Sequence, residues 1–230
     1  MTSTASMEEV HTSYVTLMGG ELGLAFATLH RKLIELHIVW QQYRQLFGSD
    51  AETVALLNRT AGLFFKIVQD EIWDSVLLGI SRLTDPPETR GKKNLTINSL
   101  LPLIDDATLK KELEELCKAA LDQSKFARDH RNKRIAHQDH AYATDRAANP
   151  LDGISRERVE SMLADLGKIM NRLNLHFRNC TTIYEGFVDD SGARVLISKL
   201  RRFERFKDES GSPNSSFKPK PLREGLNNDA

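Results

Sequence analysis

The sequence predicts an all-α fold, an antiparallel bundle of four long helices with short additional helices. Apolar residues recur at steps of three and four over long stretches, as they do on one face of an α-helix. No stretch alternates apolar and polar residues over the length of a useful strand. The chain has 230 residues, enough for one good hydrophobic core.

The first two long helices have clear apolar stripes and clear ends. Residues 22–47 carry the most regular stripe, which Gly48 closes, and a second helix is expected after Ser49 and Asp50, which are good capping residues. This helix is expected to run to Leu83, and Asp85-Pro86-Pro87 then ends it, because proline cannot donate a backbone hydrogen bond and restricts the residue before it. The stripe of the first helix consists of Leu22, Phe26, Leu29, Leu33, Leu36, Trp40, Tyr43 and Phe47.

Three further helices follow a polar loop at 85–95 and a short helix capped by Thr96. Asp105 or Asp106 caps the third long helix, which leads into residues 128–140. Ser155 caps the fourth, which reaches Phe177 at bundle spacing. A last helix is expected at about 193–206.

These elements give three parts: an extension at 1–20, a helical domain at 21–206, and a tail at 207–230. The tail is rich in Ser, Pro, Asn and Lys, so it is expected to be disordered. The polar N-terminus lacks a secretion signal, and no apolar run reaches membrane-spanning length. Cys117 and Cys180 are far apart in the sequence and are expected to be reduced thiols. The expected location is the cytoplasm, with no membrane partner.

The chain has no global positive charge, since 32 basic residues face 32 acidic ones. Positive charge is concentrated instead in residues 128–140, RDHRNKRIAHQDH, which we call the basic segment. It holds four Arg or Lys side chains and three of the seven histidines. The apolar stripe of the preceding helix continues onto Arg131, and a guanidinium on an apolar face is costly unless it is paired or solvated. This anomaly marks the basic segment as the candidate site.

The residue types in the basic segment suit RNA cleavage without a metal or other cofactor. Arg131 can bind a phosphate through two hydrogen bonds and stabilise charge in the transition state. His137 can act as general base or acid, and Asn132 can orient the phosphate or the imidazole. The remaining cations would bind the RNA backbone. They are Arg128, Lys133 and Arg134.

Several segments in order resemble the HEPN superfamily, and in particular its AbiU-type branch, which is associated with abortive infection. They are the long first helix with Trp40 and Tyr43, WDSVLLGISRLTDP (73–86), GKKNLTI (91–97) and RNKRIAHQD (131–139). The likeness spans Leu22 to Phe177. It implies an endoribonuclease of phage defence or of a toxin-like response, with Arg131, Asn132 and His137 as catalytic residues. It also implies a homodimer, and an antitoxin or regulator is a further expected partner.

The spacing of Arg131 and His137 raises a geometric difficulty. Six residues of an ideal α-helix rotate a side chain by about 600°, which leaves the two side chains about 120° apart. They can meet at one phosphate if the helix is distorted between them or ends near Ile135. Alternatively, a dimer brings Arg131 of one chain to His137 of the other. Both solutions stay open.

Other interpretations of the basic segment remain. It can be a solvated helix end in which Arg131 pairs with Asp74 or Glu71. Arg134, His140 and Tyr142 resemble the Arg-x4-6-His-x-Tyr variant of HEPN toxins, which makes Tyr142 a possible modification site. A metal site at the histidines is disfavoured because the surrounding cations repel a metal ion, so no metal is expected. The alternative function is a non-catalytic HEPN-like dimer that binds RNA, nucleotide or a protein partner.

The last helix carries a second basic feature. Between Arg194 and Lys207 lie six basic residues and one acid, Glu204, with Phe203 and Phe206 among them. Such a face can bind an RNA backbone and stack bases, or bind an acidic partner. The alternative is a capping helix with a solvated basic face.

Overall fold

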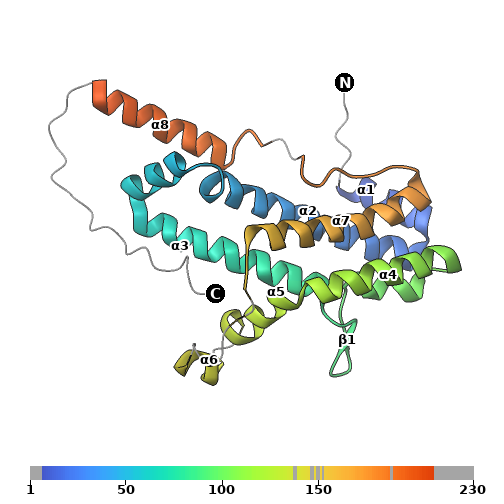
Figure 1. Cartoon of the computed structure of the whole chain (residues 1–230). Helices are drawn as coiled ribbons and strands as arrows, with labels where there is room; N and C mark the ends of the chain where they lie inside the picture. The colour runs from blue at the N-terminus through green and yellow to red at the C-terminus, as the bar shows by residue number, and fades with distance from the viewer. Residues whose placement is uncertain are drawn as a thin grey trace, which may run out of the picture. The chain divides into compact units, whose positions relative to one another are not determined.

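The computed structural model describes residues 7–136, 139–145, 148, 151, 153–186 and 189–209. The all-α class is confirmed, and the strands of the described part are two residues long (Figure 1). The elements are α1 (Met7–Met18), α2 (Gly20–Phe47), α3 (Ala51–Thr84), β1 (Glu88–Thr89), β2 (Lys92–Lys93), η1 (Ile97–Leu103), α4 (Ala107–Gln123), α5 (Lys125–His130), η2 (Arg131–Ile135), α6 (His140–Thr144), α7 (Arg156–Arg178) and α8 (Ala193–Glu209).

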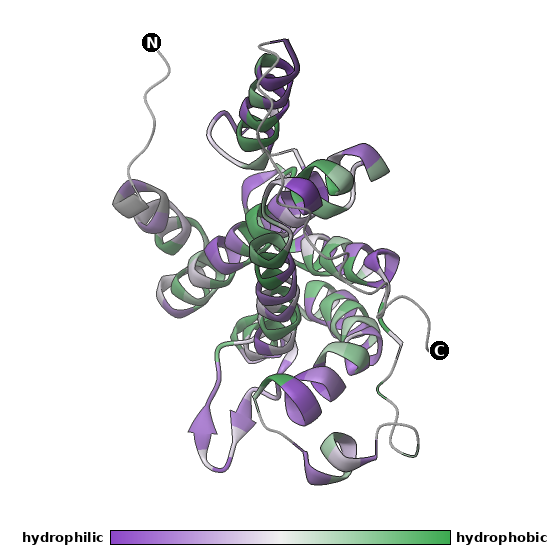
Figure 2. Ribbon diagram, turned by 90° about the vertical axis from the view of Figure 1, so that its left-hand side faces the viewer, coloured by the Kyte–Doolittle hydropathy of each residue, from purple (hydrophilic) through white to green (hydrophobic). Residues whose placement is uncertain are grey.

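The helices form two compact units, which we describe separately. The first unit comprises Met1–His37 and Asp74–Glu185, and the second comprises Ile38–Trp73 and Gly186–Ala230. Each helix carries hydrophobic and hydrophilic residues along its length (Figure 2), as an amphipathic helix that packs on one face must. No helix of the described part has the length and apolar character that crossing a bilayer requires.

The first unit has its core between the predicted apolar stripes. Helices α4 and α7 pack side by side and bury the stripe residues of both. Gly79 of α3 lies against Leu36 of α2, since a Cβ there would be 2.7 Å from the Leu36 side chain. The fully buried side chains of this unit include Phe26, Leu29, Leu33, Leu77, Ile80, Leu109, Leu113 and Phe126.

The predicted capping residues begin their helices. The Asp106 side chain accepts a hydrogen bond of 2.8 Å from the backbone N–H of Leu109, which decides between the two expected caps of α4. Ser155 likewise accepts from the backbone N–H of Arg158 at the start of α7. At the start of η1 the Ser99 hydroxyl accepts a hydrogen bond of 3.0 Å from the Thr96 backbone N–H, which is half of a capping box.

Three elements differ from the expectation. The N-terminal extension contains a helix, α1, with Tyr14 and Met18 buried. The third long helix is divided, because α4 ends at Gln123 and Ser124 separates it from α5. The last helix extends to Glu209, and residues 210–230 of the expected tail lie outside the described residues.

A small hairpin stands in the expected polar loop. Strands β1 and β2 pair in antiparallel fashion, and the turn between them is Arg90–Gly91. Both turn residues have positive φ, 51° and 75°, as a two-residue hairpin turn of type I′ requires. The hairpin strands are hydrophilic along their whole length (Figure 2).

The second unit has its own apolar core. Leu46 of α2, Leu56, Leu57 and Phe65 of α3, and Ile197 of α8 form one buried cluster. Trp40 stacks on Tyr43 with ring centroids 5.0 Å apart, and both side chains are buried. The aromatic residues near the end of α2 are therefore core residues.

A buried polar pair lies in the core of the first unit. His30 Nδ1 and the Tyr184 hydroxyl are 2.6 Å apart, and both side chains are buried. Burial lowers the pKa of His30 from its ordinary 6.5 to about 4, with a further contribution from the Arg178 charge. His30 is therefore neutral in the folded protein at neutral pH.

We predict that this histidine weakens the fold in acid. Below pH 6.5 the unfolded chain binds a proton at His30, whereas the folded protein does so only near pH 4, so stability falls across that interval. The loss attributable to His30 is about 3 kcal/mol once both pKa values are passed. Urea unfolding between pH 7.5 and 4 checks this. His30→Gln should reduce the fall in unfolding free energy between these pH values, whereas the control His176→Gln, at an exposed position, should not. An equal fall in wild type and His30→Gln would contradict the prediction.

Candidate functional site

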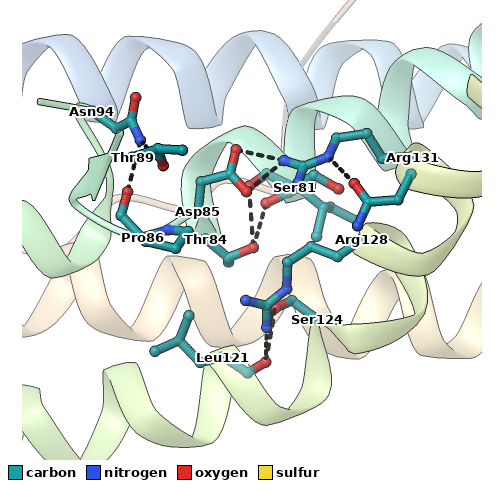
Figure 3. Close-up of polar contacts among 12 residues, drawn as sticks. Ser81, Thr84, Asp85, Pro86, Thr89, Asn94, Leu121, Ser124, Arg128 and Arg131 are labelled. Atoms are coloured by element: carbon teal, nitrogen blue, oxygen red, sulfur yellow. Dashed lines mark hydrogen bonds and ion pairs between the residues drawn. The ribbon is translucent and has the colours of Figure 1, made fainter. Parts of the chain in front are cut away.

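Arg131 forms an ion pair with Asp85 at the centre of the basic segment. Its Nη1 donates to both carboxylate oxygens of Asp85, at 2.5 and 2.6 Å (Figure 3). The two side chains are 23% and 22% exposed. The expectation of a carboxylate partner for Arg131 is thus met by Asp85, and neither Asp74 nor Glu71 holds this position. The pair is half-buried, so both side chains are partly accessible to solvent.

Asp85 is fixed by the structure on both sides of it in the chain. On one side, the buried Thr84 hydroxyl donates to the backbone carbonyl of Ile80 and closes the last turn of α3. On the other side, the Asn94 amide donates to the Pro86 carbonyl and to the Thr89 hydroxyl, each at 2.9 Å (Figure 3). The carboxylate therefore projects from a rigid corner between α3 and the hairpin.

Asn132 provides the second contact of Arg131. The Arg131 Nε donates to Asn132 Oδ1 at 3.1 Å. Nη1 is used by Asp85, and Nη2 makes no hydrogen bond to another described residue. The guanidinium is thus oriented by two partners and keeps one nitrogen for a further acceptor.

The helix that carries Arg131 is irregular from that residue onward. Residues Arg131–Ile135 form a π-helical turn, and the backbone N–H of Ala136 donates to the Arg131 carbonyl at 2.8 Å, five residues back. The helix ends at Ile135, which meets one of the two conditions under which Arg131 and His137 can converge within one chain. His137 itself lies outside the described residues.

The three cations expected to bind RNA each have a partner within the chain. Arg128 Nη2 donates to the Leu121 carbonyl and, at 3.0 Å, to the Ser124 hydroxyl. Lys133 pairs with Asp129 at 2.9 Å, and this hydrogen bond raises the pKa of Lys133. Arg134 pairs with Asp74, one of the two carboxylates that the alternative interpretation offers to Arg131. These pairs are partly exposed, so a polyanion can compete for the cations.

Two other candidate residues, His140 and Tyr142, lie on a separate short helix, α6. Asp139 caps α6 by accepting from the backbone N–H of Tyr142 at 2.9 Å, and the Tyr142 side chain is half-buried. His130 is buried at the end of α5. Within the described ranges, no three His, Cys, Asp or Glu side chains are grouped so that they could hold a metal ion.

A hollow of about 680 Å³ is lined by Pro86, which follows Asp85, and by Arg128, which precedes Arg131 by three residues. Its wall is largely apolar, with Leu101 and Leu121. Three cations, Lys110, Lys125 and Arg128, line it together with two acids, Glu114 and Asp122, so its net charge is small. The volume falls within the range of small-ligand sites.

Asp85 is the residue that the sequence analysis missed as part of the site. The sequence analysis gives Asp85 only the role of ending the second long helix. A partial signal was present, because Asp85 lies in the WDSVLLGISRLTDP segment and the proline that follows it restricts its backbone conformation.

We predict that Asp85→Asn lowers the free energy of unfolding by about 1–3 kcal/mol, because it leaves the half-buried Arg131 without its charged partner. Asp74→Asn is the matched control. It removes the partner of Arg134 in a pair that is 37% and 30% exposed, and it should cost less than about 1 kcal/mol. Urea unfolding of both variants gives the comparison, and equal losses would show that Asp85 has no special structural role.

Comparison with known proteins identifies the family of the chain. The family model of AbiU2, a HEPN family, matches residues 20–195 and so covers both Asp85 and the basic segment. No curated protein matches the chain. No solved structure matches it. Since the family model covers most of the sequence, the chain belongs to the AbiU2 family of HEPN abortive-infection proteins.

Proposed function

We propose that this protein is a metal-independent endoribonuclease whose site contains Arg131, Asn132 and His137. The observation that carries the proposal is the orientation of Arg131. Asp85 and Asn132 hold its guanidinium while Nη2 is left for another acceptor, and Arg131 lies at the irregular end of a helix. A cation held in place before the reaction stabilises a charged transition state most effectively. Membership of the AbiU2 family supports this assignment.

In the proposed reaction the 2′-hydroxyl of the RNA attacks the adjacent phosphorus. A new 2′-O–P bond forms, the P–O5′ bond breaks, and the products are a 2′,3′-cyclic phosphate and a free 5′-hydroxyl. His137 moves a proton at the 2′- or the 5′-oxygen, Arg131 donates to the non-bridging phosphate oxygens, and Asn132 keeps Arg131 oriented. No metal takes part in these steps.

The ion pair with Asp85 is compatible with phosphate binding at Arg131. A phosphate can accept from Nη2 without displacing Asp85, which then acts as a positioning residue. The hollow lined by Pro86, which follows Asp85, and by Arg128, which precedes Arg131 by three residues, offers room for the nucleoside next to the reacting phosphate. The biological role we propose is RNA degradation in phage defence, restrained by an antitoxin or regulator.

We predict that the purified chain cleaves RNA in the presence of EDTA and leaves 2′,3′-cyclic phosphate ends. His137→Ala should lower kcat/KM by about 10²–10⁴-fold and Arg131→Ala by about 10²–10³-fold. Arg131→Lys should not restore the rate, because an ammonium ion lacks the planar donor set.

Gel electrophoresis with end-group analysis gives these rates, and Lys111→Gln on the exposed face of α4 is the control. Cleavage that EDTA abolishes and zinc restores would contradict the proposal. RNA binding without cleavage would favour instead the non-catalytic module, for which the internal hydrogen bonds of Arg128 and the internal ion pairs of Lys133 and Arg134 are the supporting observation.

We predict further that the site forms between two chains of a homodimer, each giving Arg131 to the other's His137. Mixing Arg131→Ala protein with His137→Ala protein should then restore about one quarter of wild-type activity, because half of the dimers are mixed and each mixed dimer has one intact site of two. Each variant alone is the control. If both residues of a site come from one chain, mixing restores nothing, and sedimentation of a monomer would exclude the shared site directly.

A further inference from the structure

Helix α8 has a firmly fixed orientation in the second unit. Its first backbone N–H groups donate to side chains of α2: Ala193 to Gln42 Oε1 at 2.7 Å and Arg194 to Gln45 Oε1 at 3.1 Å. Such contacts satisfy the amide groups that a helix start leaves without partners. The start of α8 is therefore anchored to α2.

One face of α8 is occupied by contacts within the unit. Ala193 and Ile197 are buried in the apolar cluster. Arg201 donates to the Thr53 hydroxyl at 2.9 Å. Glu204 pairs with Arg59 at 3.0 Å. These α8 residues recur at steps of three and four, so they define the docked face.

The opposite face carries two phenylalanines among cations. Lys199, Arg202, Phe203 and Phe206 are three or four residues apart and so share this face. The two rings are 62% and 66% exposed, and both cations are exposed. We call these four residues the aromatic–basic face. An exposed aromatic pair next to two cations has no role in the packing described above.

We infer that the aromatic–basic face binds single-stranded RNA, with bases stacked on Phe203 and Phe206 and phosphates at Lys199 and Arg202. Stacking on exposed rings and charge attraction to the backbone are the two contributions that sites for single-stranded nucleic acid combine. A second copy of the chain fits poorly, because two such faces would bring like charges together. The family match ends at Val195, in the first turn of α8, so the greater part of the helix lies beyond the family domain.

This inference rests on RNA as the ligand of the proposed function, but it does not require cleavage. The probe is therefore a fluorescent 2′-O-methyl oligouridylate of fifteen nucleotides, which has no free 2′-hydroxyl to react. Fluorescence anisotropy with the full chain measures its binding. A failure of the nuclease proposal would appear in the Arg131 and His137 cleavage assays and leave this binding intact.

Phe203→Ala with Phe206→Ala should weaken binding at least about tenfold without changing its salt dependence. Phe203→Tyr with Phe206→Tyr should retain it, since a tyrosine ring also stacks. Lys199→Gln with Arg202→Gln should reduce the slope of log affinity against log salt by about 1.4, the value for two phosphate contacts to a single strand.

The matched control is Lys111→Gln with Lys118→Gln on α4, which removes the same charge from exposed positions elsewhere. Circular dichroism confirms that each variant is folded. If the control lowers RNA affinity and its salt dependence as much as Lys199→Gln with Arg202→Gln does, the effect is one of net charge and the inference is overturned. Unchanged affinity in the phenylalanine variant would overturn it too, as would binding of acidic phospholipid vesicles through these residues in place of RNA.

Discussion

The ion pair between Arg131 and Asp85 is the constraint on which the candidate site depends. A guanidinium near the apolar side of a helix needs a partner, and α3 provides one at its last corner. The same contact ties the irregular end of η2 to the end of α3. A structural requirement and the proposed catalytic one thus fall on the same arginine, because the partner that makes its burial tolerable also sets its direction.

The arrangement also explains why the hairpin is rigid at its base. Asn94 closes the loop onto Pro86, and this closure fixes the residue next to Asp85. The short strands contribute little stability themselves, since two-residue pairing is marginal. The strands instead bring the chain back to Asn94. The hydrogen bond from Asn94 to the Pro86 carbonyl then holds the backbone next to Asp85, whose carboxylate orients Arg131.

Local sequence signals predicted most of the fold. The stripe of α2, the cap at Asp106 and the end of α3 just before Asp85-Pro86-Pro87 all depend on residues close in sequence, where periodicity and backbone chemistry suffice. The site was only partly predictable. The basic segment is visible as a cluster of charge, but the partner of Arg131 is 46 residues away and no periodicity selects Asp85 over Asp74. The break at Ser124 was also missed, because the apolar stripe continues across it.

The π-helical turn at Arg131–Ile135 has a consequence for comparing related sequences. A motif written as arginine, a fixed number of residues and histidine counts positions across a turn that closes five residues back, where the usual angle per residue does not apply. Gain or loss of a single residue there can be absorbed by converting between π and α turns. Homologues with differing spacers can then keep equivalent side chains, so alignment gaps placed within this turn are structurally meaningful.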